Sequence, residues 1–383
     1  MASSDDKVSN HIPDDVAFFI LSKLSLKALK QFTCVHKSWV HLFENPNVIS
    51  MFCNNFILKD HSSYDDTCLH LKQTVPGHYY HCTLYLLSGE SFENKVILNW
   101  PSPFQADDID MDILGSGING TLCLHQYHRK IVLWNPTIGE FKVIPPSPID
   151  SQFHDTTSAT LHGFGYDSVR HDYKVRHAEF HQNNIFAGSL IVVPLEPRQV
   201  WEMYSLRSDS WRKLNVDMLP CDRSNAGAEV YMEGVCHWWG YAYDGPNLVS
   251  FNLSNEVILT TPIPLDIDEN FEWMERHLAV LNMSIVIISN HANNNYFHIS
   301  VLCELGVKES WIKLFVVGSL PCVQRPIGVG KKGDVFFIKK DSEAICLNLS
   351  NGMIEEIGVK EELFRCQIVI YKPNFLPIGR QNN

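Results

Sequence analysis

Residues 115–120 have the glycine spacing of a nucleotide-binding loop. The run reads GSGING, and G-x-G-x-x-G holds a pyrophosphate when it leads from a strand into the N-terminus of a helix. Here the next four residues are TLCL, an apolar run typical of a strand. Because no helix dipole follows, the run is interpreted as a tight loop that binds no phosphate.

Three aspartates are spaced like the start of an EF-hand calcium loop. Asp108, Asp110 and Asp112 alternate with other residues. The sixth position of that loop requires glycine and the twelfth a bidentate glutamate, but here they hold Ile113 and Asn119. We interpret the segment as an acidic surface loop and predict no metal site in it.

The other residues that could do chemistry form no strong constellation. Among 18 histidines the close pairs are His78 and His81, His125 and His128, and His177 and His181. None belongs to H-E-x-x-H, and neither a G-x-S-x-G elbow nor a P-loop is present. We therefore expect no catalytic residue, metal or cofactor. A propeller enzyme or carbohydrate binder stays an alternative because of the tryptophans, which are otherwise interpreted as core residues: Trp201, Trp211, Trp238, Trp239 and Trp273.

Composition and charge exclude several classes of partner. The 383 residues are 45% hydrophobic with a net charge of −12 and no large basic cluster, which argues against unaided binding to nucleic acid or an anionic membrane. The start, MASSDDKVSN, lacks the apolar core of a secretory signal. The 11 cysteines are scattered without C-x-x-C, which indicates reduced thiols and a cytoplasmic or nuclear location.

Residues 11–43 are strongly apolar for a short segment with a helical pattern. Pro13 and the acids after it suit a helix start, and Ser25 is a plausible cap for a second helix. A third short helix would end before Pro46. The run VAFFIL at 16–21 exceeds one turn, so apolar side chains point all round the helix. A unit this small cannot cover them alone and is expected to bind a partner.

This segment resembles the F-box, the adaptor-binding module of SCF-type ubiquitin ligases. The matching runs are IPDD at 12–15, IL at 20–21, LSLKAL at 24–29 and CVHKSW at 34–39. Two residues depart from the family pattern, Ser25 in place of proline and Gln31 in place of arginine. The resemblance implies a three-helix module that binds a Skp-type adaptor through Ile12, Pro13, Val16, Ile20, Leu21, Leu24, Leu29, Val35 and Trp39. A helical hairpin that packs on this protein's own body is the alternative.

After residue 55 the pattern changes to short strands separated by Gly, Pro, Asn, Asp and Ser. Strand–turn–strand units such as IVLWNPTIGEFKVIP and ICLNLSNGMIEEI recur at intervals of about 43 residues, close to the repeat of a four-stranded propeller blade. We predict a mainly β fold, with a small N-terminal all-α module and a β-propeller of six to eight degenerate blades. A pair of β-sandwiches is the alternative.

The body also resembles the F-box-associated domain of plant F-box proteins. The resemblance is carried by WNPTIGE at 134–140, HGFGYD at 162–167, DYKV at 172–175 and EGVCHW at 233–238. Asn135-Pro136 and Gly163-x-Gly165 are interpreted as turn chemistry at strand ends. The expected organisation is a flexible tail over 1–10, the F-box over 11–50, a linker or the entry to the first blade over 51–79, the propeller-like domain over 80–372 and a tail over 373–383.

Together the two resemblances imply a non-catalytic substrate receptor. The F-box would dock on the adaptor and, through it, on cullin and RING subunits, while the propeller would recruit an unidentified protein for ubiquitination. A scaffold that binds the adaptor without assembling a ligase is the alternative. The substrate-binding residues stay unassigned.

Overall fold

The computed structural model describes Val16 and most of residues 68–378. The gaps in the second range are 76–80, 90–91, 93, 105–110, 127–129, 148–156, 182–197, 217–228, 243–244, 264–275, 291–295, 319, 321, 331–332 and 361–365. The chain divides into two compact units, Met1–Lys59 and Asp60–Asn383. The three predicted helices of the first unit, and the alternative hairpin, lie outside the described residues except at Val16, which is helical.

The described strands of the second unit form six four-stranded sheets. The first runs β24-β1-β2-β3 and is built from Gln367–Tyr371, Cys68–Val75, His81–Ser88 and Asn94–Leu98. The next comprises β4 Met111–Ile118, β5 Thr121–Gln126, β6 Lys130–Asn135 and β7 Glu140–Ile144. The third comprises β8 Thr157–Asp167, β9 Asp172–His181, β10 Arg198–Ser205 and β11 Ser210–Leu214.

The remaining three sheets repeat this order. One comprises β12 Val230–Met232, β13 Val235–Ala242, β14 Gly245–Asn252 and β15 Ile258–Pro262. Another comprises β16 Arg276–Leu281, β17 Ser284–Asn290, β18 Phe297–Leu302 and β19 Trp311–Val317, with the short 3-10 turn η3 Lys308–Ser310 before β19. The last comprises β20 Val323–Val329, β21 Asp334–Lys339, β22 Glu343–Asn348 and β23 Ile354–Lys360.

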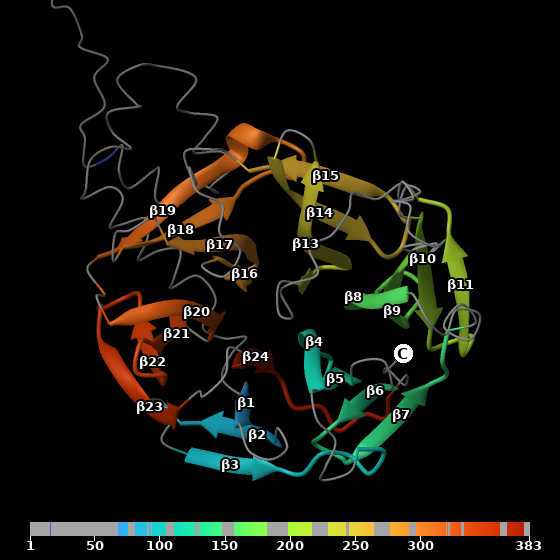
Figure 1. Cartoon of the computed structure of the whole chain (residues 1–383), viewed down its shortest axis with the longest axis horizontal. Coiled ribbons are helices and arrows are strands. Elements are labelled where there is room, and N and C mark those ends of the chain that lie inside the picture. Colours follow the sequence, from blue (N-terminus) through green and yellow to red (C-terminus); the bar gives the residue numbers. More distant parts are fainter. Residues whose placement is uncertain are drawn as a thin grey trace, which may run out of the picture. The chain divides into compact units, whose positions relative to one another are not determined.

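The six sheets stand side by side around a ring, each with its first strand nearest the centre (Figure 1). Every neighbouring pair of strands within a sheet is antiparallel, and most of these pairs are joined by short hairpin connections. The prediction of a mainly β propeller is thereby confirmed, and the described strands supply six blades. The sandwich alternative is wrong for the described residues, because successive sheets pack around a ring instead of face to face in pairs.

The ring closes through a strand from the far end of the sequence. β24 pairs with β1 in the register Leu69 with Ile370, so residues 367–371 provide the inner strand of the first sheet. The side-chain amide of Gln367 then donates to the carbonyl oxygen of Ile113 at 2.7 Å, and its oxygen accepts the Ile113 N–H at 3.3 Å. The Gln367 side chain therefore makes the same pair of hydrogen bonds to the backbone of β4 that a neighbouring strand would make, and so links the first sheet to the second.

The core lies between neighbouring sheets. One apolar cluster joins the first two sheets through residues that include Leu84, Met111, Trp134 and Val369. Another, around Trp238 and Phe251, joins the sheet of β8–β11 to that of β12–β15. Both faces of the middle strands are covered, which explains their continuous apolar runs, such as Val335–Ile338 on β21.

The two ends of the ring differ in the length of their connections. On one end the strands are joined by short turns, among them 119–120, 136–139, 168–171, 206–209, 233–234 and 282–283. The antiparallel order places the other ends of the strands on the opposite side, and several of the connections between them are much longer in sequence: 99–110, 145–156, 182–197, 215–229 and 263–275. We call the first the short-turn end.

The GSGING run belongs to the closure of the ring. Its first four residues are the end of β4, where the pairing with β5 shifts register between Leu114 and Ile118, and only Asn119 and Gly120 form a turn. A Cβ at Gly117 would lie 2.9 Å from Cδ2 of Tyr371, and one at Gly120 would overlap Asn374. The glycines therefore make room for β24 and the segment after it. The interpretation of the whole run as a loop was wrong for its first four residues.

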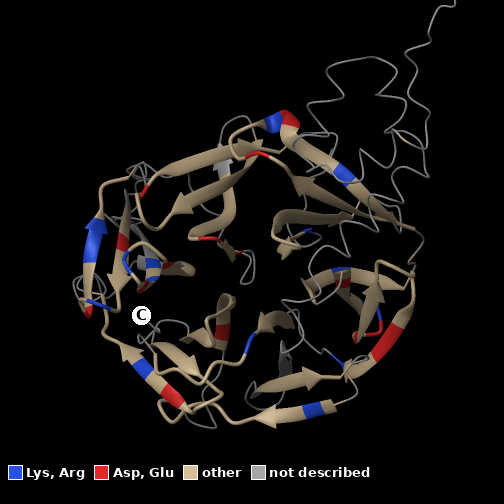
Figure 2. Ribbon diagram, turned by 180° about the vertical axis from the view of Figure 1, so that it is seen from behind, with Lys and Arg blue, Asp and Glu red and all other residues tan. Residues whose placement is uncertain are grey.

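The described part of the chain has mixed surface charge and free cysteine thiols. Lysine and arginine are interspersed with aspartate and glutamate around the ring, with no basic stripe (Figure 2). Cys123, Cys236, Cys303, Cys322, Cys346 and Cys366 are free thiols. Among the described residues no helix is both long and apolar enough to cross a bilayer.

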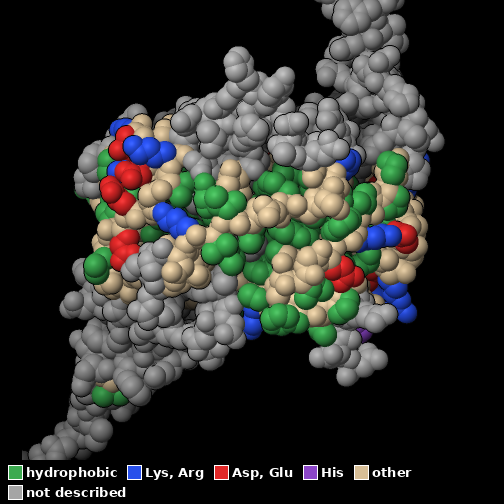
Figure 3. Space-filling view, turned by 90° about the horizontal axis from the view of Figure 1, so that it is seen from below, with side chains coloured by type: hydrophobic (Ala, Val, Ile, Leu, Met, Phe, Trp, Pro, Cys, Tyr) green, Lys and Arg blue, Asp and Glu red, His purple; other side chains and the backbone are tan. Residues whose placement is uncertain are grey.

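Hydrophobic side chains are also exposed on the outer rim of the ring. Val96 and Ile97 on β3 and Ile354 on β23 are about half exposed or more. The two strands are neighbours, because Nζ of Lys95 donates to the carbonyl oxygen of Ile357. Seen from the side on which β3 lies, hydrophobic side chains form a broad band across the rim (Figure 3).

Candidate functional site

The turn that joins β8 to β9 is organised by a buried aspartate. Asp167 ends β8 with its side chain shut off from solvent, and its Oδ1 accepts the backbone N–H groups of Val169 and Arg170 at 3.0 and 3.1 Å. This is the hydrogen bonding by which aspartate stabilises a turn. The DSVRHD run of the sequence, 167–172, thus folds into a tight turn at the short-turn end.

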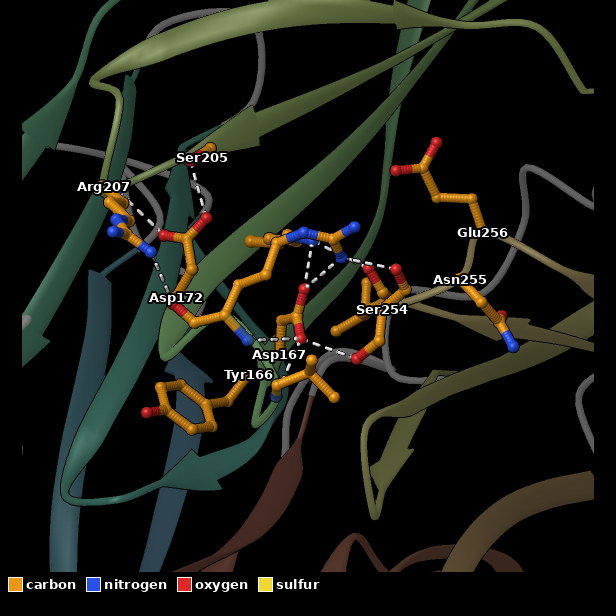
Figure 4. Close-up of polar contacts among 12 residues, drawn as sticks. Tyr166, Asp167, Asp172, Ser205, Arg207, Ser254, Asn255 and Glu256 are labelled. Carbon is orange, nitrogen blue, oxygen red and sulfur yellow. Dashed lines mark hydrogen bonds and ion pairs between the residues drawn. The ribbon is translucent and has the colours of Figure 1, made fainter.

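The same carboxylate holds two blades together. Its Oδ2 accepts Nζ of Lys174 at 2.6 Å and the guanidinium of Arg170 at 3.0 Å. Its Oδ1 accepts the hydroxyl of Ser254, from the next sheet, at 2.6 Å. Lys174 also donates to the carbonyl oxygen of Leu253 at 2.7 Å, so both members of the ion pair reach the turn 253–257 (Figure 4).

These donors decide the charge state of the buried carboxyl. Burial by itself would raise the pKa of Asp167. Hydrogen bonds from Lys174, Ser254 and Arg170 outweigh that effect and hold the pKa of Asp167 well below its usual range. The carboxyl group of Asp167 is therefore ionised at neutral pH, and its bonds form a fixed polar joint between blades.

A second aspartate organises the neighbouring turn. Asp172 begins β9, and its carboxylate accepts the Ser205 hydroxyl at 2.6 Å and the backbone N–H of Arg207 at 2.8 Å (Figure 4). The Arg207 guanidinium donates to the carbonyl oxygen of Arg170 at 3.2 Å. The turns 168–171 and 206–209 are thereby tied to each other side by side.

Asparagines make the equivalent turns in other blades. Asn135, Asn252 and Asn348 each end the third strand of a sheet. Their side-chain oxygens accept the backbone N–H two residues later, at 3.0, 2.9 and 2.9 Å. The interpretation of Asn135-Pro136 as turn chemistry is confirmed.

Between these turns lies a cavity of about 620 Å³ at the short-turn end. Its walls come from the start of β7, the turns 168–171 and 206–209 with the start of β9, and the segment after β24. The lining residues are Glu140, Phe141, Lys142, Arg170, His171, Asp172, Tyr173, Leu206, Arg207, Asp209 and Ile378. A cavity of this volume is in the range of ordinary ligand pockets.

The acidic side chains of the cavity wall are mostly engaged in bonds within the wall. Asp209 accepts the hydroxyl of Tyr204 at 2.6 Å and Nζ of Lys142 at 2.9 Å, and these hydrogen bonds lower the pKa of Asp209. Burial raises the pKa of Tyr204, and its bond to Asp209 raises it further. Glu140 accepts the backbone N–H of Ile378 at 3.0 Å through one oxygen. The wall is therefore held in place by its own carboxylates.

The tryptophans considered for carbohydrate binding are core residues where the structure describes them. Trp201, Trp238 and Trp239 are buried. The guanidinium of Arg176 lies 3.5 Å from the ring centroid of Trp238, inside the apolar cluster between two blades. Trp211 is half-buried and donates to the carbonyl oxygen of Pro145 at 2.7 Å. Trp273 lies outside the described residues.

Most of the residues predicted to bind the adaptor cannot be placed. Ile12, Pro13, Ile20, Leu21, Leu24, Leu29, Val35 and Trp39 lie outside the described residues. Val16 is helical and 44% exposed. Among the described residues there is no group of three or more His, Cys, Asp and Glu side chains that could hold a metal ion.

The residues of the cavity were not assigned a role from the sequence. Asp167 and Lys174, which do not line the cavity but join its turn 168–171 to the next blade, belong to the HGFGYD and DYKV runs that indicate only the fold. Ser254, the partner of Asp167, is 87 positions further along the chain, and no local pattern predicts such a contact. Arg170, His171 and Asp172 form one polar cluster in the sequence, and a second polar turn follows at 206–209. These two clusters are the only signal that could have suggested a site.

A closed ring of four-stranded antiparallel sheets, with its first sheet completed by a late strand, defines the β-propeller class. Residues 92–375 match the model of the F-box associated beta propeller domain. The chain therefore belongs to the plant F-box proteins that carry an F-box associated β-propeller domain.

Several relatives are proteins of Arabidopsis thaliana. A putative F-box protein is 24% identical over 67% of this chain, and the alignment spans 62% of that relative's length. An F-box/kelch-repeat protein is 23% identical over 90% of this chain and 89% of its own. F-box protein CPR1 is 23% identical over 89% of this chain and 80% of its own.

Similarity to solved structures is lower. An oligogalacturonate lyase in complex with manganese aligns over 76% of this chain and 78% of its own, with 11% identity and a TM-score of 0.41. A likeness at this level carries no information about activity.

Proposed function

We propose that the chain is the substrate-recognition subunit of an SCF-type cullin-RING ubiquitin ligase. Its N-terminal segment would dock on a Skp-type adaptor, and its propeller would hold the target protein. The observation that carries this proposal is the alignment with an F-box/kelch-repeat protein over 90% of the chain. An alignment of that extent must reach into residues 1–59, because the unit 60–383 alone is shorter.

The architecture of the second unit supports a binding role. The blades provide a rigid frame, and the strand ends that flank the long connections lie at one end of it, among them His181, Arg198, Leu214 and Val230. Loops on a fixed scaffold can vary in sequence without loss of the fold, which suits recognition of a partner. The half-exposed Val16 is available for contact with a partner as the proposal requires.

In this role the chain would break no bond itself. It would hold a target lysine close to the ubiquitin-loaded enzyme, and proximity of this kind raises the effective concentration of the reactants. Such a ligase would operate in the cytoplasm or the nucleus.

The test is co-purification of adaptor and cullin with the full chain. The variant carries Val16→Glu, Ile20→Glu and Leu21→Glu, and a matched control carries Leu259→Glu, Val316→Glu and Ile354→Glu. The three control residues are exposed apolar side chains on the outer strands β15, β19 and β23. We expect the first variant to lose adaptor and cullin together, and the control to retain both.

Adaptor binding that survives in the first variant would contradict the assignment of the docking residues and with it the proposal. Adaptor without cullin in the unmodified chain would favour a non-ligase scaffold. In both variants the thermal unfolding of the propeller should match that of the parent, because the substitutions lie at exposed positions or outside the propeller.

A further inference from the structure

The cavity at the short-turn end has a surplus of hydrogen-bond donors. Arg207 is exposed, and a guanidinium carries five N–H donors. One is used on the carbonyl oxygen of Arg170, at 3.2 Å, and the others have no partner within the described part of the chain. Lys142 likewise has a single described partner, Asp209. The donors exceed what the wall itself consumes.

Acceptors in the cavity are mostly occupied. Both oxygens of Asp172 accept bonds from the wall, one from Ser205 and one from Arg207. Both oxygens of Asp209 do the same. Glu140 keeps one oxygen without a described partner, since only its Oε2 bonds to Ile378. A ligand that complements the free donors and the one free acceptor of the cavity offers several acceptors and about one N–H donor.

Apolar surface lies beside these groups. Phe141, Leu206 and Ile378 line the cavity. Val169, at the tip of the turn 168–171, is 74% exposed, and Ile138 in the turn 136–139 is partly exposed. An apolar side chain next to the polar contact of the ligand would bury this surface, and its removal from water would favour binding.

We propose that this cavity binds an acidic peptide segment of a partner protein. A glutamate or aspartate of the peptide would pair with the Arg207 guanidinium, and a neighbouring apolar side chain would pack on Phe141, Leu206 and Ile378. A backbone N–H of the peptide would donate to the free oxygen of Glu140. The proposal rests on the proposed receptor function and adds to it the chemistry of the recognised segment.

A peptide satisfies the cavity better than a free anion does. Inorganic phosphate has no apolar part for Phe141 and its neighbours, and its negative charge would be repelled by the carboxylate of Glu140. The chain as a whole carries a net charge of −12, so general attraction would not bring anions to it. The carboxylate must therefore be recognised by a local contact with Arg207. Arginine suits this role because its planar guanidinium group can donate two hydrogen bonds to one carboxylate.

The test uses the immobilised full chain and pools of synthetic nonapeptides with randomised flanks and one fixed central residue. The pools carry glutamate, glutamine, phosphoserine or lysine at the centre. We expect the parent to retain the glutamate pool roughly tenfold more than the glutamine pool, the change that one charge-assisted hydrogen bond makes. Sequencing of the retained glutamate peptides should show apolar residues next to the centre.

Three variants decide whether Arg207 is responsible. Arg207→Gln should abolish the preference for glutamate, and Arg207→Lys should reduce it to an intermediate value. Arg212→Gln is the matched control, because Arg212 is an exposed arginine on the same sheet that pairs with Glu256 outside the cavity. It should retain the full preference. Circular dichroism melts should show that all three variants remain folded.

Equal retention of the glutamate and glutamine pools by the parent would overturn the proposal. So would equal losses in Arg207→Gln and Arg212→Gln, which would indicate only general surface charge. A phosphoserine pool retained above the glutamate pool, with the same dependence on Arg207, would overturn the assignment of a carboxylate in favour of a phosphate.

The outcome is separable from that of the receptor proposal. Arg207→Gln should co-purify adaptor as the parent does, because it changes only the cavity. If the Val16, Ile20 and Leu21 variant kept its adaptor while peptide retention still depended on Arg207, the receptor proposal would fail and the cavity assignment would stand.

Discussion

The ammonium group of Lys174 lies 2.6 Å from the carboxylate of Asp167, and both side chains are almost completely buried. The pair sits at the end of the β8–β9 hairpin and is bonded to Ser254 and Leu253 of the adjacent sheet. It therefore joins two blades at the point where the candidate cavity begins. Its removal tests how much the ring depends on polar joints.

Replacement of Lys174 by methionine should lower the free energy of unfolding by about 3 kcal/mol, because it leaves a buried carboxylate without its main partner. Lys142→Met is the matched control. Its ion pair with Asp209 is 38% and 54% exposed, so its loss should cost less than about 1 kcal/mol. Urea unfolding of both variants checks this. Similar losses in the two variants would contradict the role assigned to the buried pair.

His237 predicts a pH dependence of stability. Its side chain is fully buried, its Nδ1 lies 2.8 Å from Oγ of Ser250, and burial together with Arg176 lowers the pKa of His237 to about 3. Since the unfolded chain takes up the proton near pH 6.5, this contribution to stability is fully present above that value. It is lost as the pH falls towards 3, by up to about 1.4 kcal/mol per pH unit.

The measurement is the free energy of unfolding at about pH 7 and about pH 5, for the parent and for His237→Gln. The parent should lose more stability than the variant over this interval. The same loss in both proteins would show that His237 does not titrate on unfolding in the way its burial requires.

Trp238 tests the assignment of the tryptophans to the core. Trp238→Ala should lower stability by about 3–5 kcal/mol, as for other buried aromatic residues. Phe375→Ala is the control, because Phe375 is 78% exposed and its loss should change stability by about 0.5 kcal/mol or less. Chemical denaturation gives both values. A stable Trp238→Ala protein that had lost binding to a glycan array would revive the carbohydrate hypothesis.

Gly165 tests the close packing of two blades. A Cβ at this position would overlap Leu253 and lie 2.9 Å from Cδ2 of Tyr231, so Gly165→Ala should lower stability by about 1–3 kcal/mol. At Gly139 the φ is +71° but a Cβ would meet no atom within 4 Å. Gly139→Ala should therefore cost only the backbone strain, about 1 kcal/mol. Thermal melts compare the two, and the opposite order would contradict the packing argument.

Gln367 tests the closure of the ring. Gln367→Ala removes both bonds to the backbone of Ile113, which is buried on β4. Loss of such partners should lower stability by about 1–3 kcal/mol. Gln367→Glu keeps the acceptor for the Ile113 N–H and loses the donor to the Ile113 carbonyl oxygen. Its loss of stability should therefore come from repulsion between the carboxylate and that carbonyl oxygen, and the Ile113 N–H should stay bonded. Hydrogen exchange of the Ile113 amide should accelerate in the alanine variant more than in the glutamate variant.

Local patterns were sufficient to predict the blades. The repeat of strand, polar turn and strand is set by neighbours in sequence, and Asn135 stabilises its turn through a residue two positions away. The interpretation of Gly163 and Gly165 as turn chemistry at a strand end was wrong, because both lie inside β8, which ends at Asp167. Their spatial reason is the close approach of Cys236 from the next blade, which no local pattern shows.

The site and the closure could not be predicted in the same way. Gln367 contacts Ile113 across 254 positions, and Asp167 contacts Ser254 across 87. No periodicity connects residues this far apart, so only the folded ring shows them together. The adaptor-binding residues from Ile12 to Trp39 stay predictions, because they lie outside the described residues apart from Val16.

The pairing of β24 with β1 has a consequence for synthesis of the chain. A ribosome delivers β1, β2 and β3 early, but the strand that covers the inner edge of β1 is among the last to emerge. Throughout translation this sheet presents an unpaired edge, which is a template for aggregation. The inner edge of β1 is therefore the edge that a chaperone would have to shield, from the synthesis of β1 until residues 367–371 leave the exit tunnel.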